Sequence, residues 1–150
     1  MSKIRTAKPA DLELLTDLMA EFYAESNTPF DRTQSAAALS ELLGDTSLGQ
    51  IWLLQDDGQE VGYVVLTVGF SMEYGGKDAF VDDLFLRKGS RGRGLGRAAL
   101  EALLSGCRKR SIRAVHLEVD RSNLAARELY RKCGFRDKNR QLLTHLLTDS

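Results

Sequence analysis

The sequence has few cysteines, few prolines, no long apolar run and no net charge. Its two cysteines, Cys107 and Cys133, can form at most one disulfide, which excludes a disulfide-stabilised framework. Both lie in helical patterns, where we expect packed, free thiols. No apolar run approaches the roughly 20 residues of a membrane span, and the first residues, MSKIRTAKPADLELL, contain no apolar signal core. We therefore expect a cytoplasmic protein that does not bind membranes.

Histidine is also scarce, and the two histidines are poorly placed for metal binding. His116 and His145 are far apart in the sequence and have no cysteine or histidine at ligand spacing. We therefore expect no metal site.

Charge is balanced overall but unevenly distributed along the chain. The 21 basic and 21 acidic residues do not favour a general nucleic-acid binder. Residues 87–113, however, carry nine basic residues and only one acid, Glu101. This segment indicates a small anionic ligand. The alternative, a nucleic-acid surface, is disfavoured by the acids elsewhere and by the lack of interleaved aromatic residues.

Hydrophobic periodicity predicts a single domain over residues 1–150 that mixes helices and strands. We expect strands at 3–6, 50–55, 60–70, 79–87, 112–119 and 141–148, and helices at 9–24, 33–43, 95–110 and from 122 or 123 to 134. Short turns, including Asp57-Gly58, join the second, third and fourth strands into an antiparallel meander. The unit over 79–119 predicts a parallel pair with a right-handed crossover. The fold class is therefore α/β (α+β), a mixed, mostly antiparallel sheet of six to seven strands with helices on both faces.

The glycine-rich segment 91–96, RGRGLG, lies between a predicted strand and a predicted helix. Its glycines allow backbone N–H groups to face a ligand, and the helix N-terminus adds a partial positive charge, so the segment suits a pyrophosphate. It is not a dinucleotide fingerprint, because the sixth position from Gly92 is Arg97, and it lacks the Gly-Lys-Ser/Thr of an ATP-type P-loop. An ordinary turn with a solvated basic rim is the alternative.

These residues resemble the GNAT superfamily of N-acetyltransferases, and in particular its small-amine, diamine-type members. The family signature, Gln/Arg-x-x-Gly-x-Gly/Ala, is matched by Arg91, Gly94 and Gly96. The preceding VDDLFL at 81–86 resembles the family's fourth strand, and NLAARELYRKCGF at 123–135 resembles its second conserved block. The similarity extends from about residue 79 to 135, and before that it depends on element order alone.

The resemblance implies an acetyl-CoA-dependent N-acetyltransferase whose fourth and fifth strands splay apart around the pantetheine arm. It implies cofactor contacts from Leu84, Phe85, Leu86, Arg91, Gly92, Arg93, Gly94, Leu95, Gly96, Arg97, Asn123 and Ala126. Main-chain groups of 84–86 would pair with pantetheine like an added strand. Family members often form homodimers, and the apolar strand 141–148 would otherwise be an exposed edge, so we also expect a homodimer.

Acetyl transfer to an amine needs a base, because an alkyl amine has a pKa of about 10.4 and arrives protonated. Strand alternation places Asp82 on an apolar face with Phe80 and Leu84, which would raise its pKa. Asp82 also resembles the acidic residue of the diamine-type enzymes, so it is the predicted base or amine ligand. Asp83, on the other face, is the second candidate. For each, the alternative is a salt-bridged structural acid.

The leaving thiolate needs an acid, and Tyr130 matches the position of the family's acid. The alternative is a tyrosine that only packs. A main-chain N–H near 84–86 would stabilise the oxyanion. We do not expect a covalent acetyl-enzyme at Cys133, because no histidine is close to it in sequence.

The acceptor is expected between the first two helices and the turn after the third strand. Candidate contacts are Phe22, Tyr23, Asn27, Glu73 and Asp82, with Phe30, Trp52, Met72 and Tyr74 as further linings. The acids at this end suit a cationic small amine. Two alternatives remain, namely a protein N-terminus or lysine as acceptor, and a non-catalytic acyl-CoA-binding module, against which Asp82 and Tyr130 argue.

Overall fold

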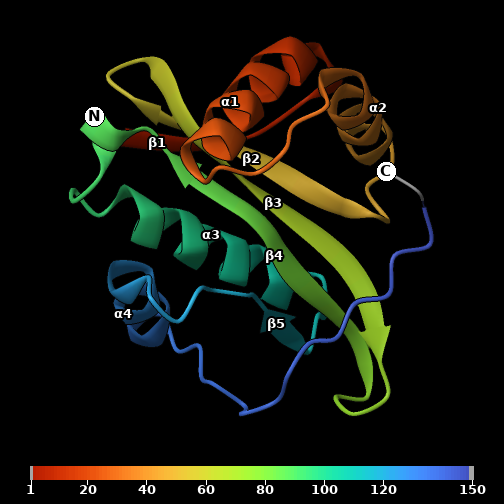
Figure 1. Ribbon diagram of the computed structural model, residues 1–150. Coiled ribbons are helices and arrows are strands. Elements are labelled where there is room, and N and C mark those ends of the chain that lie inside the picture. Colours follow the sequence, from red (N-terminus) through yellow and green to blue (C-terminus); the bar gives the residue numbers. More distant parts are fainter. Residues whose placement is uncertain (1, 149–150) are drawn as a thin grey trace. The chain divides into compact units, whose positions relative to one another are not determined.

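The computed structural model describes residues 2–148, which fall into two compact units, one ending at Glu118 and one beginning at Val119. The first unit contains a five-stranded sheet in the order β1-β2-β3-β4-β5 (Figure 1). The strands are β1 (Ser2–Thr6), β2 (Gly49–Asp56), β3 (Gln59–Ser71), β4 (Gly76–Leu86) and β5 (Ala114–His116). The first four pair antiparallel, and β5 pairs parallel with β4. The mixed, mostly antiparallel sheet is therefore confirmed.

The predicted six to seven strands are not found in the described part of the chain. Residues 141–148 form no strand, and four of their leucines are 62% to 93% exposed. The physical reason lies in the spacing. Leu142, Leu143, Leu146 and Leu147 come in adjacent pairs, and a strand needs every second residue to be apolar if one face is to be buried. The predicted strand 112–119 is also much shorter, since it forms only over Ala114–His116.

Helices cover both faces of the sheet in the first unit. The segment η1 (Pro9–Asp11) leads into α1 (Leu12–Glu25), and α2 (Arg32–Leu43) follows; both α-helices lie on one face (Figure 1). The short η2 (Lys88–Ser90) and α3 (Leu95–Lys109) follow β4, and α3 lies on the opposite face. Within the described residues, no helix is long and apolar enough to cross a bilayer.

The core beneath α1 and α2 joins helix and sheet residues that the periodicity places inward. Leu15 and Leu18 of α1 pack with Leu53 of β2 and Tyr63 of β3, and all four are fully buried. Fully burying one such aliphatic side chain contributes about 1.5–3 kcal/mol. On the other face Leu100, Leu103 and Cys107 of α3 are buried, and Cys107 and Cys133 are both free thiols.

The second unit contains one helix, α4 (Leu124–Lys132). Asn123 caps it, because its side-chain oxygen accepts a hydrogen bond from the Ala126 amide at 3.1 Å. The helix ends before Gly134, which has a φ of 94° and supplies the left-handed conformation typical of a helix C-terminus. The start and the end of this helix were both predicted from the sequence.

Candidate functional site

A β-bulge in β4 brings Asp83 to the face of the sheet that packs against α1. The paired residues of β3 and β4 are Tyr63 with Phe85, Val65 with Asp83, Thr67 with Phe80 and Gly69 with Asp78. Side chains of a strand alternate between faces, so the four β3 residues share one face and their partners share it too. Asp82 has no partner in this register, because Leu66 pairs with Val81. Asp82 is therefore the extra residue of the bulge.

The predicted face of Asp83 is wrong. Simple alternation puts Asp82 beside Phe80 and leaves Asp83 on the opposite face. The bulge adds one residue to β4, so the side chains that follow it change faces. Asp83 therefore shares a face with Phe80 and Phe85 instead. Asp82 is exposed, while Asp83 is half-buried.

Asp83 lies among hydroxyl groups in an apolar setting. The fully buried Tyr63 donates its hydroxyl hydrogen to Oδ2 of Asp83 over 3.0 Å. Burial raises the pKa of Asp83 to about 6; the neighbouring Asp82 acts in the same direction, while the Tyr63 and Tyr23 hydroxyls oppose the shift. Burial also raises the pKa of Tyr23 to about 12, so this hydroxyl stays protonated. A carboxylate with a pKa close to neutrality is well suited to general-base catalysis.

An aromatic wall from α1 stands beside Asp83. The Phe22 ring stacks on Phe85 at a centroid distance of 5.3 Å and meets Tyr63 edge-on at 6.4 Å. Tyr23 meets Phe30 edge-on at 5.8 Å. The structure therefore brings Phe22 and Tyr23, both predicted acceptor contacts, close to the carboxylate.

The other predicted acceptor contacts are scattered. Asn27 is exposed in the turn after α1, with a φ of 59°, and Glu73 is exposed in the turn between β3 and β4. Trp52 does not line this site, because it is buried on the α3 face, where its ring lies 3.6 Å from the position of a Cβ built on Gly106. Tyr63 was not predicted at all, since a Val-rich strand gives no signal that one tyrosine points to a carboxylate.

One edge of β4 is open next to this carboxylate. Pairing between β4 and β5 covers only Asp78 to Phe80, and β5 ends at His116 while β4 continues to Leu86. The main chain of 82–86 therefore has no strand partner on the β5 side within residues 2–148. The resemblance predicts a gap on this side of β4, and Leu84, Phe85 and Leu86 lie along this edge.

The glycine-rich loop presents backbone amides at the start of α3. Gly92 and Gly94 adopt left-handed φ values of 79° and 81°, which only glycine adopts without strain. A Cβ at either position would meet no atom within 4 Å, so the space above the loop is open. Gly94 is the N-cap residue and offers no side chain, so no side chain of the described residues caps the first amides of α3. Such free amides at a helix N-terminus bind phosphate groups.

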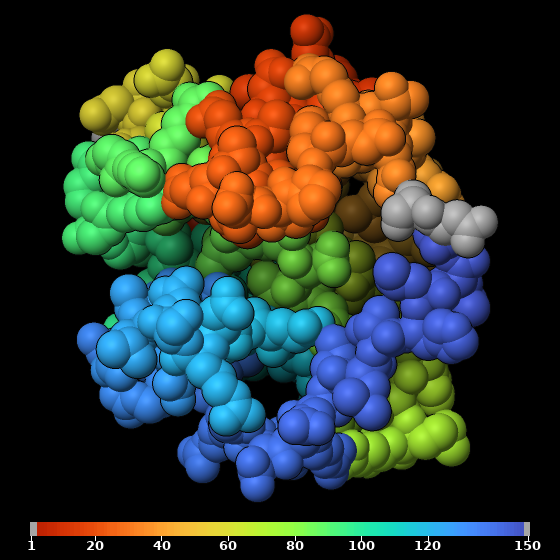
Figure 2. Space-filling model, in the orientation of Figure 1, coloured from red at the N-terminus to blue at the C-terminus, as the bar shows by residue number. Residues whose placement is uncertain are grey.

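The arginines of this loop are held by acids of the same unit. Arg91 pairs with Glu25 of α1, Arg93 pairs with Asp56 of β2, and Arg97 pairs with Glu101 at 3.0 Å. Figure 2 shows the green loop segment lying against the red-orange surface of α1. The three arginine side chains remain 42% to 55% exposed despite these pairs. Lys88 is also exposed.

The remaining predicted site residues belong to the second unit. Asn123 and Ala126 form the N-cap of α4, as described above. The Tyr130 ring packs edge-on against Phe135 at 6.0 Å, and burial raises the pKa of its hydroxyl. This hydroxyl is therefore protonated at neutral pH and can donate a hydrogen.

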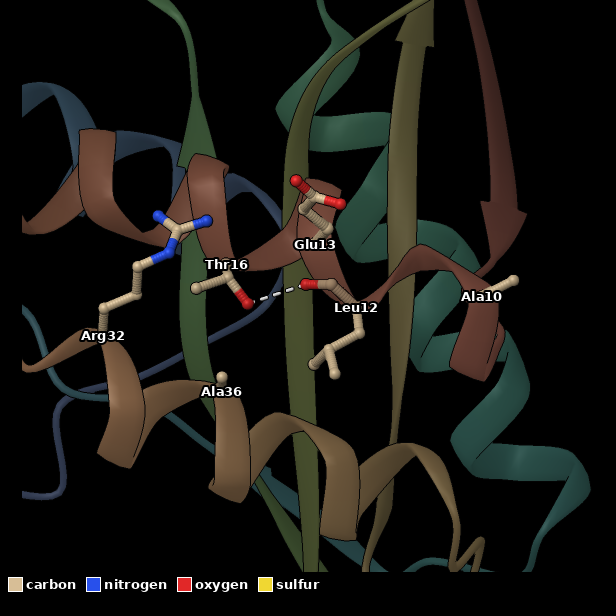
Figure 3. Close-up of a pocket in the computed structure, with 6 residues that line it drawn as sticks. All are labelled: Ala10, Leu12, Glu13, Thr16, Arg32 and Ala36. Carbon is tan, nitrogen blue, oxygen red and sulfur yellow. Dashed lines mark hydrogen bonds between the residues drawn. The ribbon is translucent and has the colours of Figure 1, made fainter.

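A separate hollow of about 480 Å³ lies between α1 and α2 (Figure 3). It is lined by Ala10, Leu12, Glu13, Thr16, Arg32 and Ala36. The Thr16 hydroxyl donates to the Leu12 carbonyl at 2.7 Å and is thereby satisfied. None of the predicted site residues lines this hollow. Among the described residues, no group of three or more His, Cys, Asp or Glu could hold a metal ion.

Comparison with known proteins identifies the family. The model of the acetyltransferase (GNAT) family matches residues 12–135, which is most of the chain. The chain therefore belongs to this family, and it is an acetyl-CoA-dependent N-acetyltransferase. No curated protein matches the chain.

Solved structures agree with this assignment. An integron cassette protein from the mobile metagenome of Cole Harbour Salt Marsh is 41% identical, with a TM-score of 0.89 over 98% of this chain and 91% of that chain. A predicted acetyltransferase of Clostridium acetobutylicum, solved with acetyl-CoA, is 19% identical, with a TM-score of 0.83 over 98% and 97%. An aminoglycoside N-acetyltransferase in complex with CoA is 15% identical, with a TM-score of 0.83 over 99% and 96%. The last two likenesses show the fold alone.

Proposed function

We propose that this acetyltransferase transfers the acetyl group of acetyl-CoA to a primary amine of a small molecule by direct attack, with Asp83 as the base. The observation that carries the proposal is the half-buried Asp83 carboxylate, which accepts a hydrogen bond from Tyr63 at 3.0 Å and lies on the strand whose edge is open. The sequence favoured Asp82. We transfer the role to Asp83 because the bulge brings Asp83 to the face lined by α1, where it bonds to Tyr63, whereas Asp82 is exposed.

The donor is held mainly by backbone groups in this proposal. The open edge of 84–86 suits pantetheine, whose amides can pair with it as a strand would. The amides of Gly92 to Arg97 suit the pyrophosphate. Asn123 and Ala126 are retained as cofactor contacts on the family resemblance. A main-chain N–H of 84–86 stabilises the oxyanion during attack.

The chemical step balances with two side chains. Asp83 accepts a proton from the ammonium, directly or through water, and the neutral nitrogen then forms a bond to the acetyl carbonyl carbon. The carbon–sulfur bond breaks as the carbonyl is restored. The thiolate takes a proton from Tyr130, which is proposed as the acid because it matches the family's position. The nitrogen loses its second proton, which returns through water to the Tyr130 phenolate, and Asp83 releases its proton to solvent. The products are the acetylated amine and free CoA.

The acceptor is proposed to be a cationic small amine that binds against Phe22 and Tyr23. Asp82 lies next to Asp83 at the exposed bulge and is proposed as a ligand for the incoming ammonium. The negative charge of these two carboxylates attracts an ammonium group and repels an anionic acceptor. A protein N-terminus or a lysine is the competing acceptor, and the experiment below separates the two.

The function is tested with purified protein, acetyl-CoA and a panel of amines. Free thiol is the readout, and mass spectrometry identifies the acetylated product. Small cationic amines should release thiol in proportion to product. If only peptides are acetylated, the acceptor is a protein N-terminus or a lysine and not a small amine. Binding of CoA with no turnover on any amine or peptide would leave a non-catalytic module and contradict the proposal.

Tyr130 is tested by replacing it with phenylalanine. We expect Tyr130→Phe to lower kcat by about 10²- to 10⁴-fold, the usual contribution of a general acid, with little change in the Kd for CoA. The matched control is Tyr74→Phe, a tyrosine to which the proposal gives no chemical role. Unchanged kcat in Tyr130→Phe would remove Tyr130 from the mechanism.

We also propose that the protein acts in the cytoplasm as a homodimer. The exposed leucines of 141–148 support a self-association surface, because monomeric proteins rarely expose such a group of apolar side chains.

A further inference from the structure

Two ion pairs join α1 to the segment that follows β4. Arg87 binds Glu21 through two contacts, Nε to Oε1 at 2.9 Å and Nη2 to Oε2 at 2.7 Å. Arg91 binds Glu25 through Nη2, and its Nε donates to the Leu86 carbonyl at 2.8 Å. Residues four apart share one face of a helix, so both glutamates project from the same side of α1. We call these two pairs the clasp.

The clasp connects the two halves of the proposed site. One end lies at Arg91, the first residue of the glycine-rich loop. The other end lies on the turns of α1 that carry Phe22 and Tyr23, which contact Phe85 and Asp83. The clasp therefore links the order of the glycine-rich loop to the position of the aromatic wall through direct contacts.

Stability alone does not account for the clasp. The side chains of the two pairs are 33% to 44% exposed, and such pairs contribute roughly 0–1 kcal/mol each. The geometry is more informative than the energy. A two-contact arginine–carboxylate pair fixes orientation as well as distance. Arg87–Glu21 is such a pair, and Arg91–Glu25 adds a single contact one helical turn away. Together they restrict rotation of the C-terminal half of α1 relative to the loop.

We propose that Glu21 and Glu25 are positioning residues that couple the phosphate loop to the acceptor wall. When CoA orders the loop, the clasp restrains the C-terminal half of α1, and Phe22 and Tyr23 are fixed beside Asp83. The proposal rests on the proposed function in taking this wall as the acceptor side. It predicts that the donor prepares the acceptor site.

Hydrogen exchange of the full chain, with and without CoA, tests the coupling without requiring turnover. In the wild type, CoA should slow exchange in both 88–98 and 19–30. In the double variant Glu21→Gln/Glu25→Gln, CoA should still slow exchange in 88–98 but no longer in 19–30. The matched control is Asp17→Asn, which removes an acid of α1 that pairs with Arg32 of α2 and not with the loop. The control should behave as the wild type.

Kinetics give a second readout that a purely structural role would not produce. At saturating acetyl-CoA, the double variant should raise the acceptor KM about 5-fold, the low end of typical coupling between sites. Its kcat should stay within about 2-fold of the wild type, because Asp83 is untouched. Asp17→Asn should change neither value.

The outcomes separate the clasp from the proposed function. Slowed exchange in 88–98 without slowed exchange in 19–30 of the wild type would overturn the clasp and leave acetyl transfer intact. An acceptor KM that is unchanged in the double variant would do the same. No slowed exchange in 88–98 would show that CoA does not bind the loop, which would overturn both.

Discussion

At the scale of single residues, Asp83 illustrates the conflict between stability and catalysis. A carboxylate buried in an apolar site is a better base, but its charged form is disfavoured by desolvation. The folded pKa of about 6 lies above the ordinary value of 3.8. The folded state therefore binds the proton more tightly than the unfolded state does. Stability is highest below the unfolded pKa and is lost as the pH rises through the folded pKa.

Because the pKa of Asp83 is raised in the folded state, its charge destabilises the folded protein at high pH. Asp83→Asn should therefore be more stable than the wild type at pH 8. The expected gain is about 1–3 kcal/mol, because asparagine carries no charge to desolvate. Urea unfolding at several pH values measures it, and the gain should vanish near pH 3.5. Asp82→Asn, at an exposed position, should show a much smaller gain. A destabilised Asp83→Asn at pH 8 would contradict the burial of this charge.

Tyr63 should tune the base. Its hydroxyl stabilises the ionised form of Asp83, so Tyr63→Phe should raise the pKa of Asp83 further. The acid limb of kcat/KM should move upward by about one unit, the worth of a hydrogen bond to a charged group. The pH profile measures this directly. Asp82→Asn removes a neighbouring negative charge and should move the limb downward, so the two variants must shift in opposite directions.

The sequence favours Asp82 over Asp83 as the base, because it gives no sign of the bulge that brings Asp83 to the α1 face. Alternation along a strand is predictable, whereas a bulge depends on how the partner strand pairs. Here the register shifts between Val65 and Leu66, two apolar residues in a continuous Val-rich run that gives no local signal. Tyr63 escaped notice for the same reason, because its role depends on this register.

At the scale of elements, most helices and strands follow from periodicity and local signals. The Asp57-Gly58 turn, the Asn123 cap and Gly134 all do what their residue types predict. The misses have physical causes. The helix predicted from Pro9 begins with a separate 3₁₀ turn, and the leucine pairs of 141–148 do not form a strand.

The β3–β4 pair requires glycine at one position beside the site. A Cβ on Gly62 would lie 2.1 Å from the Phe85 carbonyl oxygen, which is a backbone clash that no side-chain rotation relieves. Gly62→Ala should therefore destabilise the protein by about 1–3 kcal/mol or more, as overpacking does, and displace Phe85. Gly89→Ala is the control, since a Cβ there meets no atom within 4 Å. Thermal unfolding compares them, and equal melting temperatures would contradict the register.

At the scale of the whole molecule, the basic segment also has a structural role that its composition does not reveal. Its composition predicts an anionic ligand. In the structure Arg87 and Arg91 bind acids 66 residues earlier in the chain. Such partners cannot be found without the fold. The proposed anion site depends instead on the amides of the glycine-rich loop, where Gly92 and Gly94 adopt left-handed φ values.

Self-association is also a property of the whole molecule. If the leucines of 141–148 contact a second copy, replacing two of them with a charged residue should dissociate the dimer. We expect Leu143→Asp/Leu147→Asp to sediment as a monomer at concentrations where the wild type is a dimer, because a buried unpaired charge is costly. Phe70→Asp, at another exposed apolar residue, is the control. A wild type that sediments as a monomer would contradict the proposal.

The most direct test of the account compares Asp83→Asn with Asp82→Asn in amine acetylation at saturating acetyl-CoA. The account predicts that Asp83→Asn lowers kcat/KM by about 10²- to 10⁴-fold, as loss of a general base does, and abolishes the acid limb near pH 6. It predicts that Asp82→Asn keeps kcat and chiefly raises the acceptor KM. Loss of turnover in Asp82→Asn, with Asp83→Asn fully active, would contradict the central claim.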